Sequence, residues 1–291
     1  MTNASHFNSI HCPLGIGRRE KGGQAPSLSI LTRAIAAAAG LTTDQGEVVL
    51  KVGITMSDEQ CPFPPLALLR LQSWLSPAFP IGSYSYSHGL EWAIEAGYIY
   101  ERKSFVDWLE ADLCYGSGRN EAIFFGEAWR SAINDDHAKL LEIAELAAAF
   151  RGTSEFALES SQQAAACLAT LRQVWPDRIL DWLSEILCEH HVQPALAVVI
   201  GVRLARQGVP AGLALPAFLQ SYVANLVSAG VRLIPLGQTD GQRAIADLEG
   251  AVLAASGQAE KATIDDLGSA AFMVDLASAA HETQYTRLFR S

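Results

Sequence analysis

The chain contains 291 residues, of which 49% are hydrophobic and 18% are charged, and its 31 acidic side chains outnumber its 21 Lys and Arg residues, for a net charge of −10. This length and apolar content are sufficient to bury a large core, which excludes an intrinsically disordered protein. The acidic balance, without a clustered basic run, argues against nucleic acid or an anionic membrane surface as the main partner. Proteins or small molecules are therefore the favoured partners.

Residues 1–55 differ from the rest of the chain in composition. Glycine and proline are scattered among small polar residues, and basic side chains outnumber acidic ones. We expect a disordered extension here, with Met56 as an alternative start. The alternatives are a transit-like or twin-arginine-like leader around Arg18 and Arg19, which lacks a continuous apolar segment, and a small appended module. Residues 56–291 form the expected domain.

From Pro65 onward, apolar residues recur at helical spacing. Ser104 followed by Asp107 is typical of a capping box, and Pro176 is expected as the first residue of another helix. We therefore predict one all-α domain, a bundle of about ten helices joined by short loops. Beyond the two helices marked by those signals, the helical segments are Glu121–Ile133, Asp136–Phe150, Ser154–Leu171, Pro194–Arg206, Leu213–Ile234, Gln242–Ser256 and Asp265–Ala280.

The stretch from Gln207 to Val231 contains no charged side chain. It is long enough to cross a membrane by the criterion of about 20 apolar residues. Prolines and polar side chains such as Pro210, Pro216 and Asn225 interrupt it. These interruptions favour a buried central helix of a bundle over a membrane helix.

The five cysteines are odd in number, widely spaced and never arranged as C-x-x-C. This usage, without a recognisable cleavable signal, is typical of a protein of the reducing cytoplasm. No G-x-x-x-x-G-K-[ST] run is present, which excludes a P-loop GTPase.

Two groups of residues are candidates for chemistry. Cys188, His190 and His191 are possible ligands for nickel or zinc. Residues two and three apart on a helix point in well-separated directions, so exposed histidines at a helix C-terminus are the favoured interpretation. His88 is a possible base, but spacing assigns it neither a nucleophile nor an orienting acid, and a locally hydrogen-bonded loop histidine is favoured. We predict no catalysis and no cofactor.

Three segments carry unusual composition. Ser76–Glu91 combines two prolines and a glycine with hydroxyl-bearing and aromatic residues, which indicates either a polar contact surface or an elaborate helix N-cap. Pro235–Arg243 is either a second contact loop or an ordinary helix connection, with Thr239 or Asp240 as the next cap. His281–Ser291 alternates apolar residues with arginines, which indicates either a frayed terminus or a segment that orders on docking into a partner.

Together these segments resemble the UreF family of urease accessory proteins. The matching runs are SPAFPIGSYSYSHGLEWAIEAG at 76–97, NLVSAGVRLIPLGQTDGQR at 225–243 and HETQYTRLFRS at 281–291. Glu159 and Ser160 fit a middle element of the family's pattern. The resemblance extends from about residue 66 to the last residue and leaves the first 55 residues without a counterpart.

The resemblance implies an all-α homodimer, without catalysis, that helps to insert nickel into apo-urease. In that family UreF bridges UreD, called UreH in some organisms, and the nickel-carrying GTPase UreG, and the assembly engages the urease apoprotein. GTP hydrolysis on UreG is coupled to nickel delivery. The surface facing UreG is expected to include Tyr84, Ser85, Ser87, Glu91, Gln238 and Arg243, and the surface docking UreD or UreH to include Glu282, Tyr285, Arg287, Phe289 and Arg290.

Two alternatives remain open. Arg243 could resemble an arginine finger supplied in trans, which would make the protein an activator of the UreG GTPase. An arginine beside a helix start more often pairs with a nearby carboxylate or carbonyl. Alternatively, Cys188, His190 and His191 would make it a nickel-binding protein.

Overall fold

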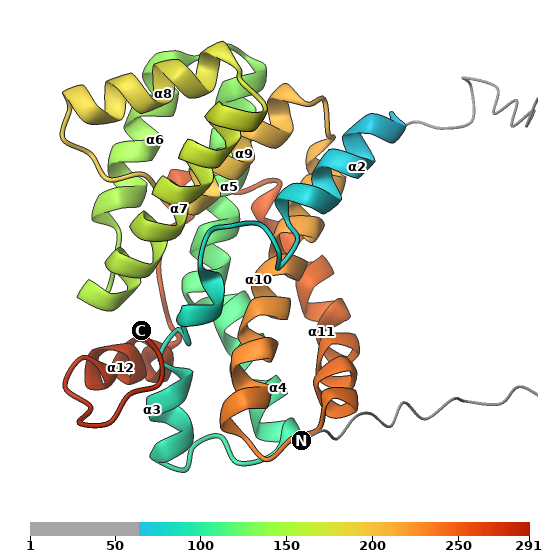
Figure 1. Ribbon diagram of the computed structural model, residues 1–291, viewed down its shortest axis with the longest axis vertical. Coiled ribbons are helices and arrows are strands. Elements are labelled where there is room, and N and C mark those ends of the chain that lie inside the picture. Colours follow the sequence, from blue (N-terminus) through green and yellow to red (C-terminus); the bar gives the residue numbers. More distant parts are fainter. Residues whose placement is uncertain (1–63) are drawn as a thin grey trace, which may run out of the picture. The chain divides into compact units, whose positions relative to one another are not determined.

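The computed structural model describes residues 64–291 (Figure 1). In this range it contains eleven α-helices, two short 3-10 helices and no strand, so the predicted all-α fold is confirmed there. The expected extension at residues 1–55 and the alternative start at Met56 lie outside the described residues. The elements are α2 Pro65–Trp74, η1 Ser83–Ser85, α3 Leu90–Glu95, α4 Arg102–Tyr115, α5 Ser117–Ile133, α6 His137–Ala149, α7 Ser154–Val174, α8 Arg178–Glu189, α9 Leu196–Arg206, α10 Ala211–Leu233, α11 Gln238–Ala259, η2 Ile264–Asp266 and α12 Phe272–His281.

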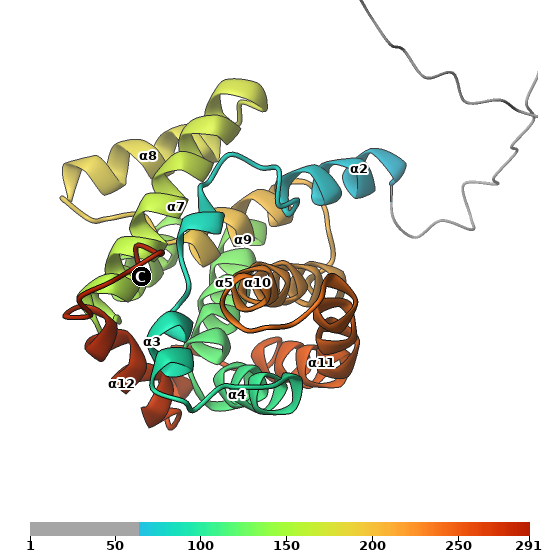
Figure 2. The ribbon, with the colours of Figure 1, turned by 60° about the horizontal axis from the view of Figure 1, so that its bottom comes forward.

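Helix α5 lies at the centre of this arrangement. It packs against α4, α6, α9, α10 and α11, and Figures 1 and 2 show the neighbouring helices on different sides of it. Twelve of its seventeen residues are buried. A helix enclosed in this way needs apolar or small side chains on every face, which its phenylalanine, alanine and glycine residues supply.

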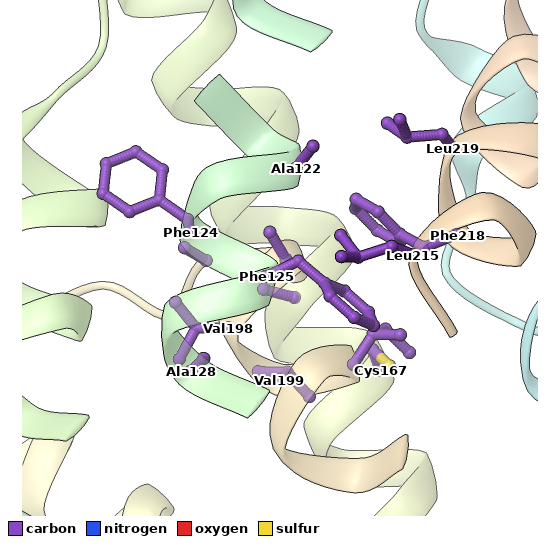
Figure 3. Packing of buried hydrophobic residues seen from close by; sticks show 14 of the residues in the cluster. Ala122, Phe124, Phe125, Ala128, Cys167, Val198, Val199, Leu215, Phe218 and Leu219 are labelled. Carbon is purple, nitrogen blue, oxygen red and sulfur yellow. The ribbon is translucent and has the colours of Figure 1, made fainter. Parts of the chain in front are cut away.

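Gly201 of α9 allows α5 and α9 to approach closely. A Cβ at this position would lie 2.7 Å from the backbone oxygen of Phe125 in α5. The Phe125 ring stacks on Phe218 of α10, with ring centroids 4.9 Å apart, and Cys167 of α7 belongs to the same core (Figure 3). Burial raises the pKa of the Cys167 thiol to about 12. The thiol therefore stays neutral and acts as a small apolar core group.

Helices α4, α10 and α11 meet through further glycines. Phe105 of α4 is fully buried, and its ring Cζ lies 2.3 Å from where a Cβ of Gly230 in α10 would be. Gly241 of α11 leaves similar room for Val231, whose Cγ2 lies 2.7 Å from the corresponding Cβ position. Close packing at these two positions compensates for the low helix propensity of glycine.

The start of α4 differs from its prediction. The helix begins at Arg102, so Ser104 is the third helical residue, and its Oγ accepts the backbone N–H of Glu101 at 3.2 Å. Asp107, predicted to complete the box, instead accepts Lys103 Nζ at 2.6 Å on the exposed face. A capping box is therefore present, as predicted, but its N-cap is Glu101, three residues before the predicted N-cap Ser104.

Two other helix starts also differ. Pro176 is not the first residue of α8, because Asp177 caps that helix by accepting the Ile179 N–H at 3.2 Å. Helix α11 begins at Gln238 after the N-cap Gly237, so neither of the two predicted capping residues holds the N-cap position.

Helix α12 is shorter than predicted. The segment from Asp265 was expected to be helical, but it forms part of η2 and then an irregular connection that reaches Phe272. The backbone N–H of Gly268 in this connection donates to Asn120 Oδ1 of α5 at 3.1 Å. A tertiary contact thus replaces the helical hydrogen bond that the periodicity suggested.

Among the described helices, α10 is the one that is long and apolar enough to cross a membrane. Half of its most apolar window is buried inside the fold, where α10 packs against α3, α5, α9 and α11. Pro216 lies within it. This placement agrees with the predicted buried helix of a bundle.

Candidate functional site

The connection between α2 and α3 turns a histidine into the interior. His88 has a φ of 57° and Gly89 a φ of 76°, so two successive residues adopt the left-handed conformation. That conformation is uncommon for a residue other than glycine and is found at positions fixed by their surroundings. A Cβ at Gly89 would also lie 2.8 Å from the backbone nitrogen of Ser278. Glycine at this position therefore permits both the turn and the contact of α3 with α12.

His88 joins elements that are distant in sequence. Its Nδ1 lies 3.1 Å from Glu159 Oε2 of α7, and its Nε2 lies 2.5 Å from Ser117 Oγ at the start of α5. Its ring stacks on Phe156, with centroids 4.0 Å apart. The expectation of a locally hydrogen-bonded loop histidine is therefore wrong, because these polar partners are 71 and 29 residues away.

Asp112 and Tyr222 complete what we call the His88 cluster, formed by residues 88, 112, 117, 159 and 222. Asp112 Oδ1 accepts the Ser117 hydroxyl at 2.7 Å, and Oδ2 accepts the Tyr222 hydroxyl at 2.7 Å. Because Ser117 donates its proton to Asp112, its oxygen accepts from His88, and both ring nitrogens of His88 act as donors. The distances are similar to those of a catalytic serine–histidine–acid triad. Here, however, the Ser117 hydroxyl donates its proton to Asp112, so His88 is not placed to remove that proton as a general base.

The charges of the His88 cluster compensate one another only in part, because one histidine faces the two carboxylates of Glu159 and Asp112. Burial by itself lowers the pKa of His88, but the Glu159 carboxylate, through its charge and its hydrogen bond, contributes to a net rise above the ordinary value. Burial and the Asp112 carboxylate raise the pKa of Tyr222 well above its usual range, so the phenol remains a donor. The cluster thus contains a buried ion pair of His88 with Glu159 and a second buried carboxylate, Asp112, that accepts hydroxyl hydrogen bonds. Such an arrangement is costly unless its geometry is maintained.

A second buried histidine ends α12. The side chain of His281 is fully buried, with Nδ1 2.7 Å from Glu155 Oε2 of α7 and Nε2 3.2 Å from Glu91 Oε2 of α3. Both ring nitrogens of His281 therefore face a carboxylate oxygen. We call His281, Glu91 and Glu155 the His281 cluster.

The terminal segment, residues 281–291, is ordered against the rest of the described fold, beside α3 and α7 (Figures 1 and 2). The backbone N–H groups of Leu288 and Phe289 donate to the two oxygens of Glu91 at 2.7 and 2.9 Å. The Phe289 ring is buried, with the Arg232 guanidinium 4.4 Å from its centroid. A carboxylate and a buried ring thus hold this segment in place.

The last two residues extend these contacts. The Arg290 N–H donates to the Ser85 backbone oxygen at 2.8 Å, and the N–H and hydroxyl of Ser87 donate to the Ser291 backbone oxygen at 2.6 and 2.5 Å. Ser291 Oγ donates to Glu159 Oε2 at 3.0 Å. Since this same oxygen pairs with the histidine of the His88 cluster, the terminal segment and that cluster share an acceptor.

The residues predicted to dock a partner from the terminal segment have different environments. Tyr285 is fully exposed and Glu282 is exposed, although Glu282 Oε1 accepts the N–H and hydroxyl of Ser154. Those hydrogen bonds lower the pKa of Glu282. Phe289 is buried inside the chain, which makes it an anchor of the segment instead of a contact residue. Leu288, an apolar residue of this segment that was not among the residues assigned to docking, is 78% exposed.

The two arginines of this set lie at the edge of the fold. Arg287 Nη1 donates to Glu155 Oε1 at 2.9 Å, and Arg290 Nη1 lies 3.3 Å from Gln162 Oε1. Both side chains keep part of their surface accessible, so they remain available to a partner while supporting the segment.

The first predicted contact surface also divides into exposed and buried residues. Tyr84 is 70% exposed and Ser85 is partly exposed. Ser87 and Glu91 are buried, and their polar atoms bind the terminal segment. We therefore omit these two from the candidate contact surface, because a partner cannot reach them in this conformation.

Gln238 and Arg243 lie in the first turns of α11 and are exposed. Arg243 Nη1 pairs with Asp240 Oδ1 at 2.9 Å, the kind of local pairing expected beside a helix start. In the described range, no hydrogen bond or ion pair joins either residue to segment 83–91. The two parts are connected through α10, where Arg232 donates to the Tyr84 backbone oxygen.

The candidate metal ligands lie at the end of α8. Cys188, His190 and His191 are all exposed, and His190 Nδ1 lies 3.2 Å from Glu145 Oε1 of α6. His191 has a φ of 56° just beyond the helix. Within residues 64–291, no group of three or more His, Cys, Asp or Glu side chains is arranged to hold a metal ion.

A cavity of about 490 Å³ lies beside the His88 cluster. Residues of α5, α7, α9 and α10 and of the connection after α2 line it, and the His88 and Glu159 side chains form part of its wall. Most of the lining is apolar, with Phe156 and Phe218 among the larger side chains. A mainly apolar cavity of this size with a few polar groups is typical of a small-molecule site.

Sequence reasoning missed both histidine clusters. Each run of the family resemblance contributes a member or a neighbour: His88 and Glu91 from 76–97, Glu159 from the middle element, Arg232 from 225–243 and His281 from the last run. Their presence in these runs was the signal from which sequence analysis could have singled them out. Which residue pairs with which depends on helix packing and cannot be read from spacing.

Comparisons with known proteins agree on one family. The family model described as UreF matches residues 99–249. A protein of Rhodopseudomonas palustris described as urease accessory protein UreF is 48% identical over 225 residues, which cover 77% of this chain and 91% of the relative. Proteins with the same description from Bradyrhizobium diazoefficiens and Granulibacter bethesdensis are 48% and 46% identical over 225 residues, covering 77% of this chain and 92% and 94% of theirs.

Proposed function

Because this chain belongs to the UreF family of urease accessory proteins, we propose that it is a non-catalytic cytoplasmic scaffold required for nickel insertion into apo-urease. It bridges UreD, or UreH, and the GTPase UreG, and couples GTP hydrolysis on UreG to nickel delivery. It acts as a homodimer within a complex that engages the urease apoprotein. The docking role is supported by one observation. The terminal segment is hydrogen-bonded to the rest of the fold, yet the side chains of Tyr285 and Leu288 are exposed.

The surface for UreD or UreH is centred on Tyr285 and Leu288. These side chains are the most exposed large apolar groups in the terminal segment, at 103% and 78%. Glu91 and the Phe289 anchor fix the backbone that presents them. A preorganised segment loses little conformational entropy on binding, which favours affinity. Glu282, Arg287 and Arg290 form the polar rim of this surface.

The surface for UreG comprises Tyr84, Ser85, Gln238 and Arg243. Tyr84 is an exposed aromatic side chain, a residue type enriched in protein interfaces. Its backbone oxygen accepts Arg232 Nη1 at 2.8 Å, which fixes its position. Among residues 64–291, Arg243 pairs only with the partly exposed Asp240, and such surface pairs contribute about 0–1 kcal/mol. Arg243 is therefore free to exchange that partner for one on UreG.

The docking surface is tested by co-purification. The double change Tyr285→Ala and Leu288→Ala should abolish retention of UreD or UreH and leave the helical circular dichroism and urea midpoint unchanged. A matched control is Val174→Ala with Leu253→Ala, which removes two exposed apolar side chains on α7 and α11. Retention of UreD or UreH by the first variant would remove this surface from the proposal.

The activator alternative is separated by enzyme kinetics. A scaffold binds UreG without changing its intrinsic rate of GTP hydrolysis. An activator would instead accelerate GTP hydrolysis by UreG. If Arg243→Ala abolished this acceleration and Arg243→Lys retained only part of it, Arg243 would be an arginine supplied in trans.

A further inference from the structure

Buried carboxylates on α3 and α7 hold the terminal segment. Three glutamates accept hydrogen bonds from its last residues, and they are 7%, 5% and 8% exposed: Glu91, Glu155 and Glu159. In residues 64–291, Arg287 is the one cation other than histidine that pairs with any of them, and its side chain is 40% exposed. A buried carboxylate is costly unless positive charge or hydrogen bonds compensate it. The two buried histidines therefore supply much of this compensation.

The His281 cluster needs one hydrogen more than its deprotonated groups supply. Its two contacts, from Nδ1 to Glu155 Oε2 at 2.7 Å and from Nε2 to Glu91 Oε2 at 3.2 Å, each require a hydrogen between nitrogen and oxygen. A neutral imidazole carries one such hydrogen, and an ionised carboxylate carries none. Without a further proton, a ring-nitrogen lone pair would face a carboxylate oxygen. The cluster therefore holds one extra proton in this conformation, on the ring or on a carboxylate.

Three elements contribute the charged groups around His281. Glu91 comes from α3, Glu155 from α7 and Arg287 from the terminal segment, where it pairs with the other oxygen of Glu155. In the described part of the chain, no further ion pair reaches these side chains. Two carboxylates thus face one imidazole and one partly exposed guanidinium. Loss of the extra proton would leave this buried group with a net negative charge.

The His88 cluster extends the same dependence to the last residue of the segment. Glu159 Oε2 lies 3.1 Å from His88 Nδ1 and accepts the Ser291 hydroxyl at 3.0 Å. The titratable groups that face His88 are Glu159 on α7, Asp112 on α4, Glu121 on α5 and Tyr222 on α10. Burial lowers the pKa of His88, but the carboxylates produce a net rise above its ordinary value. Its contribution is therefore present below about pH 6.5 and is lost as pH rises through the raised pKa.

We propose that the attachment of the terminal segment depends on pH. The segment stays bound while both histidine clusters hold their protons, and it detaches as these protons are lost at higher pH. Detachment admits water to Glu91 and Glu155, which solvates the charges that have lost their partner. The segment yields before the helices because residues 282–291 are irregular and are joined by a few hydrogen bonds, whereas α3 and α7 pack against other helices.

The consequence for docking rests on the proposed function. Glu91 and the Phe289 anchor fix the backbone that presents Tyr285 and Leu288. Detachment would therefore remove the preorganisation of this surface, so that UreD or UreH would bind more weakly at high pH.

Backbone hydrogen exchange of the purified full chain tests the attachment directly. The amides of Leu288 and Phe289 are followed from pH 6 to pH 9, because both donate to Glu91. Their protection factor is the intrinsic exchange rate divided by the measured rate, which removes the chemical acceleration of exchange by base. This factor should fall by about tenfold or more, since one released proton changes an equilibrium by up to about tenfold per pH unit. The amide of Phe125 in α5 should stay more protected at every pH, because the segment opens without the core.

One variant supplies the missing hydrogen without a proton from solvent. In Glu155→Gln, the side-chain N–H can donate to His281 Nδ1 while the amide oxygen still accepts Arg287. The fall in protection between pH 6 and pH 9 should therefore be smaller than in the wild type. Adding His88→Gln should make the protection constant within about twofold, because neither cluster then releases a proton in this range.

Glu282→Gln is the matched control. Glu282 belongs to the same segment and also bonds to α7, through the N–H and hydroxyl of Ser154, but it contacts neither histidine. This variant should keep the fall in protection seen in the wild type. If the double variant does not fold, the comparison of Glu155→Gln with Glu282→Gln decides by itself.

Any of three results overturns the pH-dependent attachment. These are segment protection that stays constant or rises with pH in the wild type, an equal fall in Glu155→Gln and Glu282→Gln, and segment amides that are as protected as Phe125 at every pH. The third result would mean that the segment opens only when the whole fold does. The measurement needs no accessory partner, so its failure would leave the proposed scaffold function intact.

Discussion

The Oε2 atom of Glu91 receives hydrogen bonds from both the imidazole of His281, at 3.2 Å, and the backbone N–H of Phe289, at 2.9 Å. Its other oxygen accepts the backbone N–H of Leu288 at 2.7 Å. One carboxylate on α3 thus holds the end of α12 and the terminal segment together. This residue had been expected to face a partner.

Glu91→Gln should therefore destabilise the fold. The amide offers one acceptor oxygen, and its NH₂ group must face another donor, which leaves buried polar groups unpaired. We expect a loss of about 3–5 kcal/mol in the free energy of unfolding, measured by urea denaturation. Glu95→Gln is the control, because Glu95 is exposed on the same helix. Equal effects of the two changes would contradict the structural role of Glu91.

The His88 cluster predicts a pH dependence of stability. The folded pKa of His88 is raised above its unfolded value of about 6.5, so the contribution of the charged imidazole is fully present below that pH and is lost as pH rises through the folded pKa. The stability difference between the wild type and His88→Gln should be larger at about pH 6 than at about pH 9, as measured by urea denaturation. A stability difference that stays constant or grows with pH would contradict a stabilising charge on His88.

The close contact of α5 and α9 predicts a cost for one methyl group. In Gly201→Ala the new Cβ would meet the Phe125 backbone oxygen, which cannot move without shifting α5. Overpacking of this kind costs about 1–3 kcal/mol in the free energy of unfolding. Gly250→Ala is the control, since nothing lies within 4 Å of its Cβ position. It should instead stabilise the helix by about 0.5–1 kcal/mol.

We expect the exposed side chains of Cys188, His190 and His191, at the end of α8, to contribute little to nickel binding. We expect the combined variant Cys188→Ala, His190→Ala and His191→Ala to bind the same amount of nickel as the wild type in equilibrium dialysis. The reason is that, within residues 64–291, no group of three or more His, Cys, Asp or Glu side chains is arranged to hold a metal ion, and His190 already pairs with Glu145. A reduced stoichiometry would identify them as ligands and support the nickel-binding alternative.

The helical fold was predictable because its signals are local. The apolar periodicity of α5 to α11 marks these helices, and errors arise where side chains bond outside their own segment. Asp265 was assigned to a helix, yet the connection after it bonds to α5 through Asn120. Ser104 was taken as the N-cap because a hydroxyl usually occupies that position of a capping box, whereas here Glu101 is the N-cap and Ser104 is the third helical residue.

The candidate site was less predictable because its pairs are not local. His88 and Glu159 are 71 residues apart, and His281 and Glu91 are 190 residues apart. A sequence identifies such residues as unusual but not as partners. Burial reverses the interpretation of Ser87 and Glu91. Both were expected at the surface, and instead their side chains bind the terminal segment inside the fold.

The distance along the chain between these partners has a consequence for biosynthesis. His281 is translated 190 residues after Glu91 and 126 residues after Glu155, so a nascent chain that has completed α3 and α7 still lacks the side chain that joins these two carboxylates. Long-range closures of this kind form late and slowly. The contacts of the terminal segment with α3 and α7 therefore form late in folding, and a chain truncated before His281 would lose part of its interior along with the proposed docking surface.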